Sequence, residues 1–444
     1  MHALFSTLIL SYFRMLARWQ LLKIKPTIIG VTGSAGKSST LEAIAAILSQ
    51  EHTVKVGRKA NSESGIPLDI LGLKPTNFSL LDWLRLSISA PLQLLTNWQR
   101  YEYYIVEMGI DSPLPPKNMS YLLTILQPDI GVFTSVGAVH SQPFDHLVVG
   151  KTAQERADSL TELIAQEKGK LIKSLPQTGL AVLNKDQSAL LRGATPTQAK
   201  LMTFSHHDAA ADIQIAKTTW DENGTHFVFT TGEEKVGLHF SRYILPEHFG
   251  GTFAASLCVG LYLGYSPYRS CKLLEKNFEL PPGRATLIPG INHSTIIDSS
   301  YNSSARPLLD LLEMLKHLRA GRRLALLGDM RELGEISQFE HEKIATVASD
   351  ILDEVYLVGP LMHQYAAPIF EKKGVPVRCF TNAYTAGQYI RTILKPEDVI
   401  LVKGSQNTLL LEIAIEQCMN DPETAPAVLC RRGAYWDSQR AALR

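Results

Sequence analysis

Residues 26–48 constrain the fold more than any other segment, because an apolar run, a glycine-rich loop and a helix-like run follow one another directly. The run PTIIGV at 26–31 predicts a buried strand. Leu41, Ile44 and Leu48 recur on one face of a helix that starts near Lys37. A strand, a glycine loop and a helix in this order are typical of a parallel α/β sheet.

The loop itself, GVTGSAGKSST at 30–40, has the composition of a phosphate-binding loop. Gly33 and Gly36 allow the backbone N–H groups to converge on phosphate oxygens, and Lys37 adds a positive charge. The hydroxyl of Ser38 can bind Mg²⁺. The pattern G-x-x-x-x-G-K-[ST] is met except at its first glycine, where Val31 stands. We therefore expect binding of a nucleoside triphosphate with Mg²⁺, through Thr32, Gly33, Ser34, Ala35, Gly36, Lys37, Ser38 and Ser39.

The composition favours a compact, multidomain chain with small-molecule sites. The 444 residues include 44 Lys and Arg against 43 Asp and Glu, so no general attraction to nucleic acid is expected. The five cysteines are far apart and show no C-x-x-C spacing, which fits a reducing cytoplasm.

Residues 3–22, ALFSTLILSYFRMLARWQLL, are a helix-like apolar run interrupted by Arg14 and Arg18. Its uninterrupted part is shorter than the roughly 20 residues that span a bilayer. Its charges follow the apolar run, unlike those of a cleaved signal. Two interpretations stay open: packing on the chain's own domain, or contact with the inner face of the membrane, for which both arginines and Trp19 are suited.

Short apolar strands at 104–106 and 130–134, and a helical stretch at 153–172, continue the α/β pattern. Residues 210–240 alternate between polar and apolar, which predicts an antiparallel appendage. The segment LPPGR at 280–284 marks a boundary. Beyond it we expect a doubly wound unit with strands at 295–297, 324–327, 355–358, 377–380 and 399–402. The predicted domains are a helix at 1–25, a central ATP-binding domain at 26–284 and a C-terminal Rossmann-like domain at 285–444.

Several segments together resemble the Mur ligases, the ATP-dependent amino-acid ligases of peptidoglycan synthesis. TGSAGKSS resembles their phosphate loop, and NSESGIPL, IVEMG and TSVGAVH are similar to segments that follow it in the same order. DSSYNSS, LLGDMRELGE and LVKGS resemble the C-terminal domain of the branch that adds D-alanyl-D-alanine to a UDP-muramoyl tripeptide.

This resemblance implies a reaction and a set of site residues. ATP phosphorylates a carboxylate, and the amine then attacks the acyl phosphate, with Mg²⁺ and a lysine neutralising charge. The resemblance implies that Lys168 captures CO₂ as a carbamate. The implied catalytic residues are Lys37, Glu107, His140 and Lys168; the implied magnesium ligands are Ser38, Glu107, His140 and Lys168. Further contacts to the nucleotide are implied for Arg284, Tyr301 and Asn302.

The sequence also departs from the family. HFGGT at 248–252 lacks the two asparagines of the family's H-N-x-x-N, Ser299 stands where a ribose-binding aspartate is expected, and Gln406 replaces an arginine. We expect base and ribose recognition to be altered. The resembling branch carries an N-terminal domain that holds the UDP-sugar, whereas only the apolar helix precedes the loop in this sequence. We therefore expect the UDP-sugar site to be missing or to be supplied by a partner protein; a membrane-borne acceptor would fit the helix.

The expected function is thus a cytoplasmic ATP-dependent carboxylate-amine ligase acting on a muramoyl peptide and D-Ala-D-Ala. One alternative is a related ligase with another acceptor, of the folyl-polyglutamate or cyanophycin type, against which LGDMRELG argues. Another is a nucleotide-binding partner protein that has lost ligation. No segment resembles a guanine-specificity motif, which disfavours a GTPase.

Overall fold

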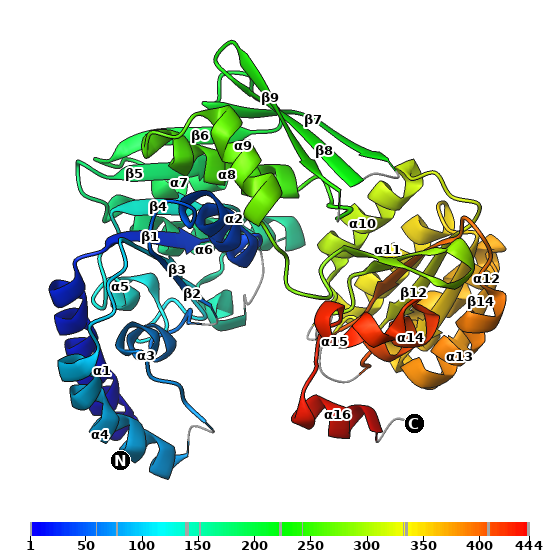
Figure 1. Ribbon diagram of the computed structural model, residues 1–444, viewed down its shortest axis with the longest axis horizontal. Helices are drawn as coiled ribbons and strands as arrows, with labels where there is room; N and C mark the ends of the chain where they lie inside the picture. Colours follow the sequence, from blue (N-terminus) through cyan, green and yellow to red (C-terminus); the bar gives the residue numbers. More distant parts are fainter. Residues whose placement is uncertain are drawn as a thin grey trace. The chain divides into compact units, whose positions relative to one another are not determined.

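The computed structural model describes residues 2–58, 60–76, 79–137, 142–150, 152–221, 224–241, 243–331, 333, 336–405 and 409–441. The chain divides into two compact units (Figure 1). The first unit comprises Met1–Lys217, Phe227–Leu238 and Phe249–Phe278. The second unit comprises Thr218–His226, His239–His248 and Glu279–Arg444.

A nine-stranded sheet has the strand order β2-β3-β1-β4-β5-β6-β7-β8-β9. Its strands up to β6 pair in parallel, as predicted for the α/β part. Strands β7, β8 and β9 follow one another through two-residue connections, which only antiparallel neighbours allow. The strands are β1 (Thr27–Thr32), β2 (Val54–Gly57), β3 (Tyr103–Glu107), β4 (Ile130–Phe133), β5 (Leu180–Asn184), β6 (Lys200–Ser205), β7 (Ile213–Asp221), β8 (Gly224–Thr231) and β9 (Glu234–Phe240).

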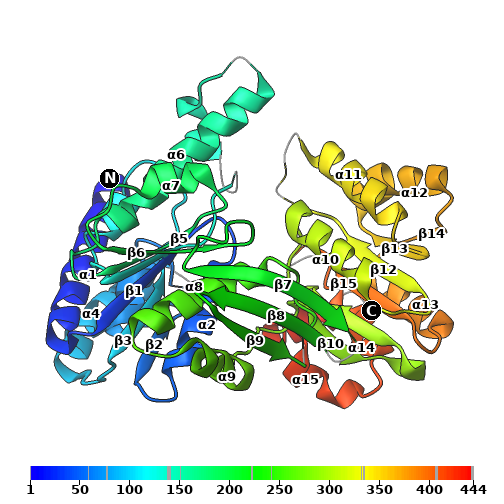
Figure 2. The ribbon, with the colours of Figure 1, turned by 90° about the horizontal axis from the view of Figure 1, so that it is seen from above.

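Helices cover both faces of this sheet. Helices α6 and α7 lie on one side, and α2, α8 and α9 lie on the other (Figure 2). The helices of the first unit are α1 (His2–Ile24), α2 (Lys37–Leu48), α3 (Gly65–Leu71), α4 (Leu80–Thr96), α5 (Met119–Leu122), α6 (Ala153–Lys173), α7 (Ser188–Ala194), α8 (Phe249–Tyr262) and α9 (Pro267–Asn277), with a 3₁₀ turn at Gln142–Leu147. None of the helices in the described part of the chain has the length and apolar character needed to cross a bilayer.

The second unit contains a six-stranded sheet with the order β10-β11-β15-β12-β13-β14. Its edge strand β10 is antiparallel to β11, and the other pairs are parallel, so the predicted doubly wound unit is confirmed. The strands are β10 (Thr286–Pro289), β11 (Thr295–Asp298), β12 (Arg323–Gly328), β13 (Glu354–Val358), β14 (Val377–Phe380) and β15 (Val399–Lys403).

Two hydrophobic clusters lie on the two faces of that sheet, because alternate residues of β12 point to opposite sides: Ala325 and Leu327 join one cluster, and Leu324 and Leu326 join the other. The helices are α10 (Ala305–His317), α11 (Ser337–Ser349), α12 (Ala367–Lys373), α13 (Ala383–Ile393), α14 (Glu412–Cys418), α15 (Ala425–Val428) and α16 (Ala434–Ala441), with short turns at Ile291–His293, Met362–Ala366 and Pro422–Thr424.

Candidate functional site

The phosphate loop joins the buried strand β1 to the N-terminus of α2. Gly36 caps the helix in the left-handed conformation, with φ of 80°. Gly33 has φ of 151°, and a Cβ atom built on it would lie 2.1 Å from Oγ1 of Thr134. The backbone conformation therefore favours glycine at both positions, and at Gly33 the close approach of Thr134 also excludes a side chain.

The segment after β4 holds this loop in place. Oγ1 of Thr134 donates a hydrogen bond to the carbonyl oxygen of Ala35 over 2.7 Å, and the N–H of Ala35 donates to Oγ of Ser135 over 2.9 Å. The hydroxyl of Ser34 donates to the carbonyl oxygen of Gly137 over 2.9 Å. The sequence pattern missed Thr134 and Ser135 as site residues, although their segment TSVGAVH was recognised as a family motif. Their position at the end of β4, beside the loop that follows β1, is the signal that could have identified them.

A carboxylate lies beside the loop's lysine and serine. Val31 of β1 is paired in register with Glu107, the last residue of β3, so Glu107 reaches the edge of the sheet where the loop begins. Nζ of Lys37 lies 3.6 Å from Oε1 of Glu107, and Oγ of Ser38 donates a hydrogen bond to Oε2 over 2.8 Å. A carboxylate and a hydroxyl side by side are the hard oxygen ligands that Mg²⁺ prefers.

Lys168 of α6 contacts the same loop through its side-chain amine. Its side chain is buried, and Nζ donates a hydrogen bond to the carbonyl oxygen of Gly33 over 2.6 Å. Burial, followed by the positive charge of Lys37, lowers the pKa of Lys168 to about 7, although Glu107 and Asp111 act in the opposite direction. Burial thus favours the neutral, nucleophilic form of this amine over its charged form.

A capping box sets the start of the helix that carries Lys168. The side chain of Thr152 accepts a hydrogen bond from the N–H of Glu155, and the carboxylate of Glu155 accepts one from the N–H of Thr152, each over 3.1 Å. This reciprocal pair satisfies two N–H groups that the first helical turn leaves unpaired.

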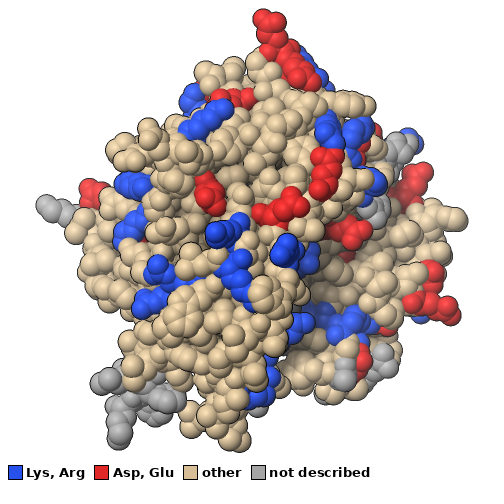
Figure 3. Space-filling model, turned by 60° about the vertical axis from the view of Figure 1, so that its left-hand side comes forward, with Lys and Arg blue, Asp and Glu red and all other residues tan. Residues whose placement is uncertain are grey.

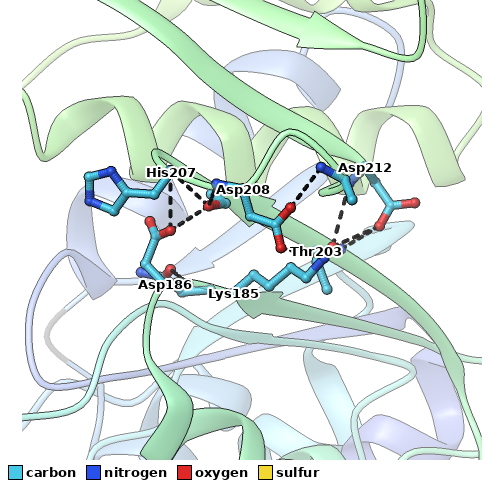
Figure 4. A network of polar contacts seen from close by, with 9 residues as sticks. Lys185, Asp186, Thr203, His207, Asp208 and Asp212 are labelled. Atoms are coloured by element: carbon cyan, nitrogen blue, oxygen red, sulfur yellow. Dashed lines mark hydrogen bonds and ion pairs between the residues drawn. The ribbon is translucent and has the colours of Figure 1, made fainter.

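A polar network ties together the ends of β5, β6 and β7 (Figure 4). Asp186 accepts hydrogen bonds from the hydroxyl of Ser205 and the N–H of His206, while Lys185 forms an ion pair of 2.8 Å with Asp208. Oδ2 of Asp212 accepts a hydrogen bond from the N–H of Thr203 over 2.7 Å. The network thus orders the turn at 206–212.

The turn at 206–212 lies against the first residues of α8. Phe249 and Thr252 stand there at the two positions where the family motif has asparagine. A Cβ atom on Gly250 would lie 3.2 Å from Cε1 of His206 and 2.9 Å from Cγ2 of Ile215. Thr252 is buried, and its Oγ1 would lie 3.6 Å from a Cβ atom on Gly36. The lack of a side chain at Gly250 therefore leaves room for the ring of His206, and Thr252 lies beside the phosphate loop.

Three further predicted residues lie together in the second unit. The guanidinium of Arg284 lies 5.0 Å from the ring centroid of Tyr301, and Nζ of Lys403 donates a hydrogen bond to the carbonyl oxygen of Asn302 over 2.8 Å. Burial, with a smaller effect of the Arg284 charge, lowers the pKa of Lys403 to about 8. Arg431 also donates to the carbonyl oxygen of Tyr301, over 2.5 Å.

Arg431 was missed by the sequence analysis because it lies in a weakly patterned, polar C-terminal segment. The structure buries it, and its guanidinium forms an ion pair of 2.7 Å with the buried Glu412. The predicted site residue His140 and the replacement Gln406 lie outside the described residues.

The possible metal ligands at this site are oxygen atoms. Within the described ranges, no group of three or more His, Cys, Asp and Glu side chains is placed to hold a metal ion. The potential oxygen ligands at the loop are instead Ser38 and Glu107, to which a carbamate on the neighbouring Lys168 would add a third. This donor set fits Mg²⁺.

Comparison with curated proteins shows similarity to one group of relatives. The ligase named UDP-N-acetylmuramoyl-tripeptide--D-alanyl-D-alanine ligase from Bacillus subtilis is 27% identical over 91% of this chain and 78% of the relative. Its namesake from Synechocystis is 27% identical over 94% of this chain and 80% of the relative.

Solved structures share the fold. MurF ligase from Thermotoga maritima in complex with ADP has a TM-score of 0.68 at 24% identity, covering 92% of this chain and 83% of that one. Folylpolyglutamate synthase from Mycobacterium tuberculosis in complex with ADP has a TM-score of 0.60 at 14% identity, covering 90% of this chain and 92% of that one.

Two family models match consecutive parts of the chain. Residues 31–249, which contain the phosphate loop, Glu107 and Lys168, match the Mur ligase middle domain. Residues 283–406, which contain Arg284, Tyr301 and Lys403, match the Mur ligase glutamate ligase domain. Because both models match, in the same order as in the family's architecture, the chain belongs to the Mur ligase family.

Proposed function

We propose that this Mur ligase uses ATP to add D-alanyl-D-alanine to a muramoyl tripeptide in peptidoglycan precursor synthesis. The relatives that carry this activity in their names match about nine-tenths of the chain. The observation that carries the proposal is the convergence of Lys37, Ser38, Glu107 and Lys168 on one phosphate loop. A loop that only bound phosphate would not need a buried amine with a lowered pKa beneath it.

In this proposal the residues of the loop from Thr32 to Ser39 hold the triphosphate, with the N-terminus of α2 directed at it. Lys37 neutralises phosphate charge, while Ser38, Glu107 and His140 hold Mg²⁺. Mg²⁺ bound by these residues would supply positive charge that reduces the repulsion between the phosphate and the attacking carboxylate. Closure of the site against water would protect the acyl phosphate from hydrolysis.

Lys168 is proposed to carry the carbamate. Its neutral amine attacks CO₂: a C–N bond forms, one C=O π bond of CO₂ breaks to give a carboxylate, and one N–H proton leaves to solvent, so that a neutral amine becomes an anion that can ligate Mg²⁺. The lowered pKa supports this step because only the unprotonated amine has the electron pair that the step uses.

We propose that Arg284, at the hinge between the predicted domains, contacts the nucleotide together with Tyr301 and Asn302 of a C-terminal domain at 285–444. Their support is that Arg284 packs on the ring of Tyr301 and that Lys403 holds the backbone of Asn302. The absence of the family's asparagines at 249 and 252 supports an altered adenine contact, with Thr252 beside the loop.

Phosphate release tests the proposal. The full chain is incubated with ATP, Mg²⁺, UDP-linked muramoyl tripeptide and D-Ala-D-Ala, and each substrate is omitted in turn. The proposal expects turnover only when all are present. Turnover with a folate and glutamate would favour the folyl-polyglutamate alternative, and ATP binding without acceptor-dependent release would favour a partner protein that has lost ligation.

A membrane location is proposed as well. We propose that residues 3–22 contact the inner membrane surface, because Leu8, Met15, Trp19 and Leu22 of α1 are exposed in the structure. A partner protein that supplies the UDP-sugar site stays a prediction.

A further inference from the structure

Helix α4 presents an unusually apolar surface to solvent. Its exposed side chains include Leu84, Ile88, Leu92 and Leu95, which are 58%, 61%, 59% and 70% exposed. Residues three or four apart share one face of a helix, so these four form a single stripe. The opposite face is also apolar, because Leu86 and Ala90 are buried in a cluster with Phe13 of α1.

Helix α1 has the same two-sided character. Leu8, Met15, Trp19 and Leu22 lie on one face and are exposed, whereas Leu16, on another face, is buried. A helix that only packed on its own domain would carry polar residues on the outer face. The two interpretations offered by the sequence are therefore compatible, since one face of α1 packs and the other is free for contact.

The two exposed stripes adjoin. The hydroxyl of Tyr12 donates to the carbonyl oxygen of Ser87, and Nζ of Lys23 donates to that of Leu94, each over 2.9 Å. The later residue of α1 contacts the later residue of α4, so the two helices run in the same direction. Figures 1 and 2 show them side by side.

The hydrogen-bonded side chains also border the stripes. On α1, Tyr12 and Lys23 each lie four residues after an exposed residue of the stripe, Leu8 and Trp19. On α4, Ser87 lies three residues after Leu84. Because residues three or four apart are neighbours on a helix surface, the contact between the helices runs along the edge of each stripe. The combined surface, here called the α1–α4 face, consists of Leu8, Met15, Trp19, Leu22, Leu81, Leu84, Ile88, Leu92, Leu95 and Trp98.

The two segments that form this face carry more basic than acidic residues. Residues 2–25 contain Arg14, Arg18, Lys23 and Lys25 and no acidic residue. Between residues 79 and 100 the single acidic residue is Asp82, which is buried and paired with Arg85. In Figure 3, which brings this side forward, the lower left of the surface is tan with blue atoms beside it, and red atoms lie above.

The aromatic residues are placed as at a membrane boundary. Nζ of Lys23 lies 3.8 Å from the centroid of the Trp98 ring, and Trp19 lies one turn before Lys23 on α1. Tryptophan beside lysine is typical of the headgroup level of a bilayer, where an apolar ring and a cation both find partners. A second copy of this chain would instead bring a second set of cations against the first.

We infer that the α1–α4 face is a docking surface for an anionic lipid bilayer, with the α4 leucines entering the acyl boundary and the lysines and arginines facing lipid phosphates. The inference rests on the proposed membrane contact of residues 3–22 and extends it in two ways. It adds α4 as a second inserting helix, and it specifies anionic lipid as the partner.

Vesicle flotation of the full chain tests this inference. Phosphatidylcholine vesicles are compared with vesicles that also contain phosphatidylglycerol, at low and high salt. We expect flotation with the anionic vesicles and its weakening by salt. The variant Ile88→Asp/Leu92→Asp changes two exposed side chains and should reduce the bound fraction at least ~tenfold. Phe339→Asp, on α11 and similarly exposed at 63%, is the matched control and should float like the parent.

Other results would overturn the inference in distinguishable ways. If Leu8→Asp/Leu22→Asp abolishes flotation but Ile88→Asp/Leu92→Asp does not, contact through α1 stands and the role of α4 is rejected. Equal binding to both vesicle types rejects the anionic partner. Self-association that Ile88→Asp/Leu92→Asp abolishes, without flotation of the parent, assigns the face to a second copy. Thermal melting of each variant verifies its folding, and flotation is read without reference to ligase turnover.

Discussion

Nζ of Lys168 donates a hydrogen bond over 2.6 Å to the carbonyl oxygen of Gly33, so the buried amine of α6 contacts the turn proposed to hold the triphosphate. A modification of this amine would therefore take place directly at the phosphate loop. The contact also links two residues that lie 135 positions apart in the sequence.

The pH dependence of activity should report the state of Lys168. Because its pKa is lowered from 10.5 to about 7, acidification below that value protonates the amine and removes the form that reacts with CO₂. We expect kcat to fall on the acidic side of about pH 7 and to depend on added bicarbonate. Steady-state kinetics between about pH 6 and pH 9 check this, with ¹³C-labelled bicarbonate to detect the carbamate by NMR.

The matched variants are Lys168→Met and Lys170→Met, since Lys170 lies on the same helix but pairs with Glu167. Only the first should lose activity at every pH and lose the ¹³C signal. A Lys168→Met enzyme with the parent's pH profile would contradict the assignment.

Glu107→Gln should lower kcat by ~10²–10³-fold, because it removes the negative charge beside Lys37 and Ser38 without changing the side chain's shape. The Mg²⁺ concentration needed for half-maximal activity should rise. Glu102→Gln, just before the same strand β3, serves as the control and should leave both quantities unchanged. An unaltered Mg²⁺ requirement in Glu107→Gln would show that Glu107 is not a metal ligand.

Gly33→Ala should destabilise the protein by ~1–3 kcal/mol and weaken ATP binding, because the new methyl group would meet Oγ1 of Thr134 at 2.1 Å. Gly237→Ala is the comparison, since a Cβ atom there meets nothing within 4 Å. Urea denaturation and calorimetric titration with ATP provide the two measurements. Equal effects of the two substitutions would contradict the close approach at Gly33.

Arg431→Met should destabilise the second unit by ~3–5 kcal/mol, because it leaves the buried carboxylate of Glu412 without its ion-pair partner. The double variant Glu412→Leu/Arg431→Met should recover part of this loss. The exposed pair of Lys373 and Asp350 supplies the contrast, since Lys373→Met should cost less than ~1 kcal/mol. Chemical denaturation measures all three, and a loss in Arg431→Met no larger than in Lys373→Met would disprove the role of the buried pair.

Much of the architecture could be predicted from local patterns. The strand, loop and helix around Gly33 and Lys37, and the five parallel strands that follow residue 294, were predicted because their apolar periods are regular and glycine marks the turns. The proximity of Glu107 to the loop followed from the family motif. The domain boundaries at residues 25 and 284 stay predictions.

The features that escaped prediction depend on contacts between distant segments. The helical spacing of the α4 leucines predicts an apolar face, but it does not show whether that face is buried in a core or exposed to solvent. Arg431 has no periodic neighbours that would predict its burial, which results from Glu412 and the carbonyl oxygens of Ser300 and Tyr301. The contact of Lys168 with Gly33 depends on how α6 packs beneath the sheet.

The capping box of Thr152 and Glu155 has a consequence for how the chain can evolve. It sets where the helical winding begins, and Lys168 follows Thr152 by sixteen positions. Adding one residue between them would rotate the lysine by about 100° around the helix axis and advance it by about 1.5 Å. Insertions that a surface loop would tolerate should therefore be excluded from this stretch, whose length determines the direction in which the amine points.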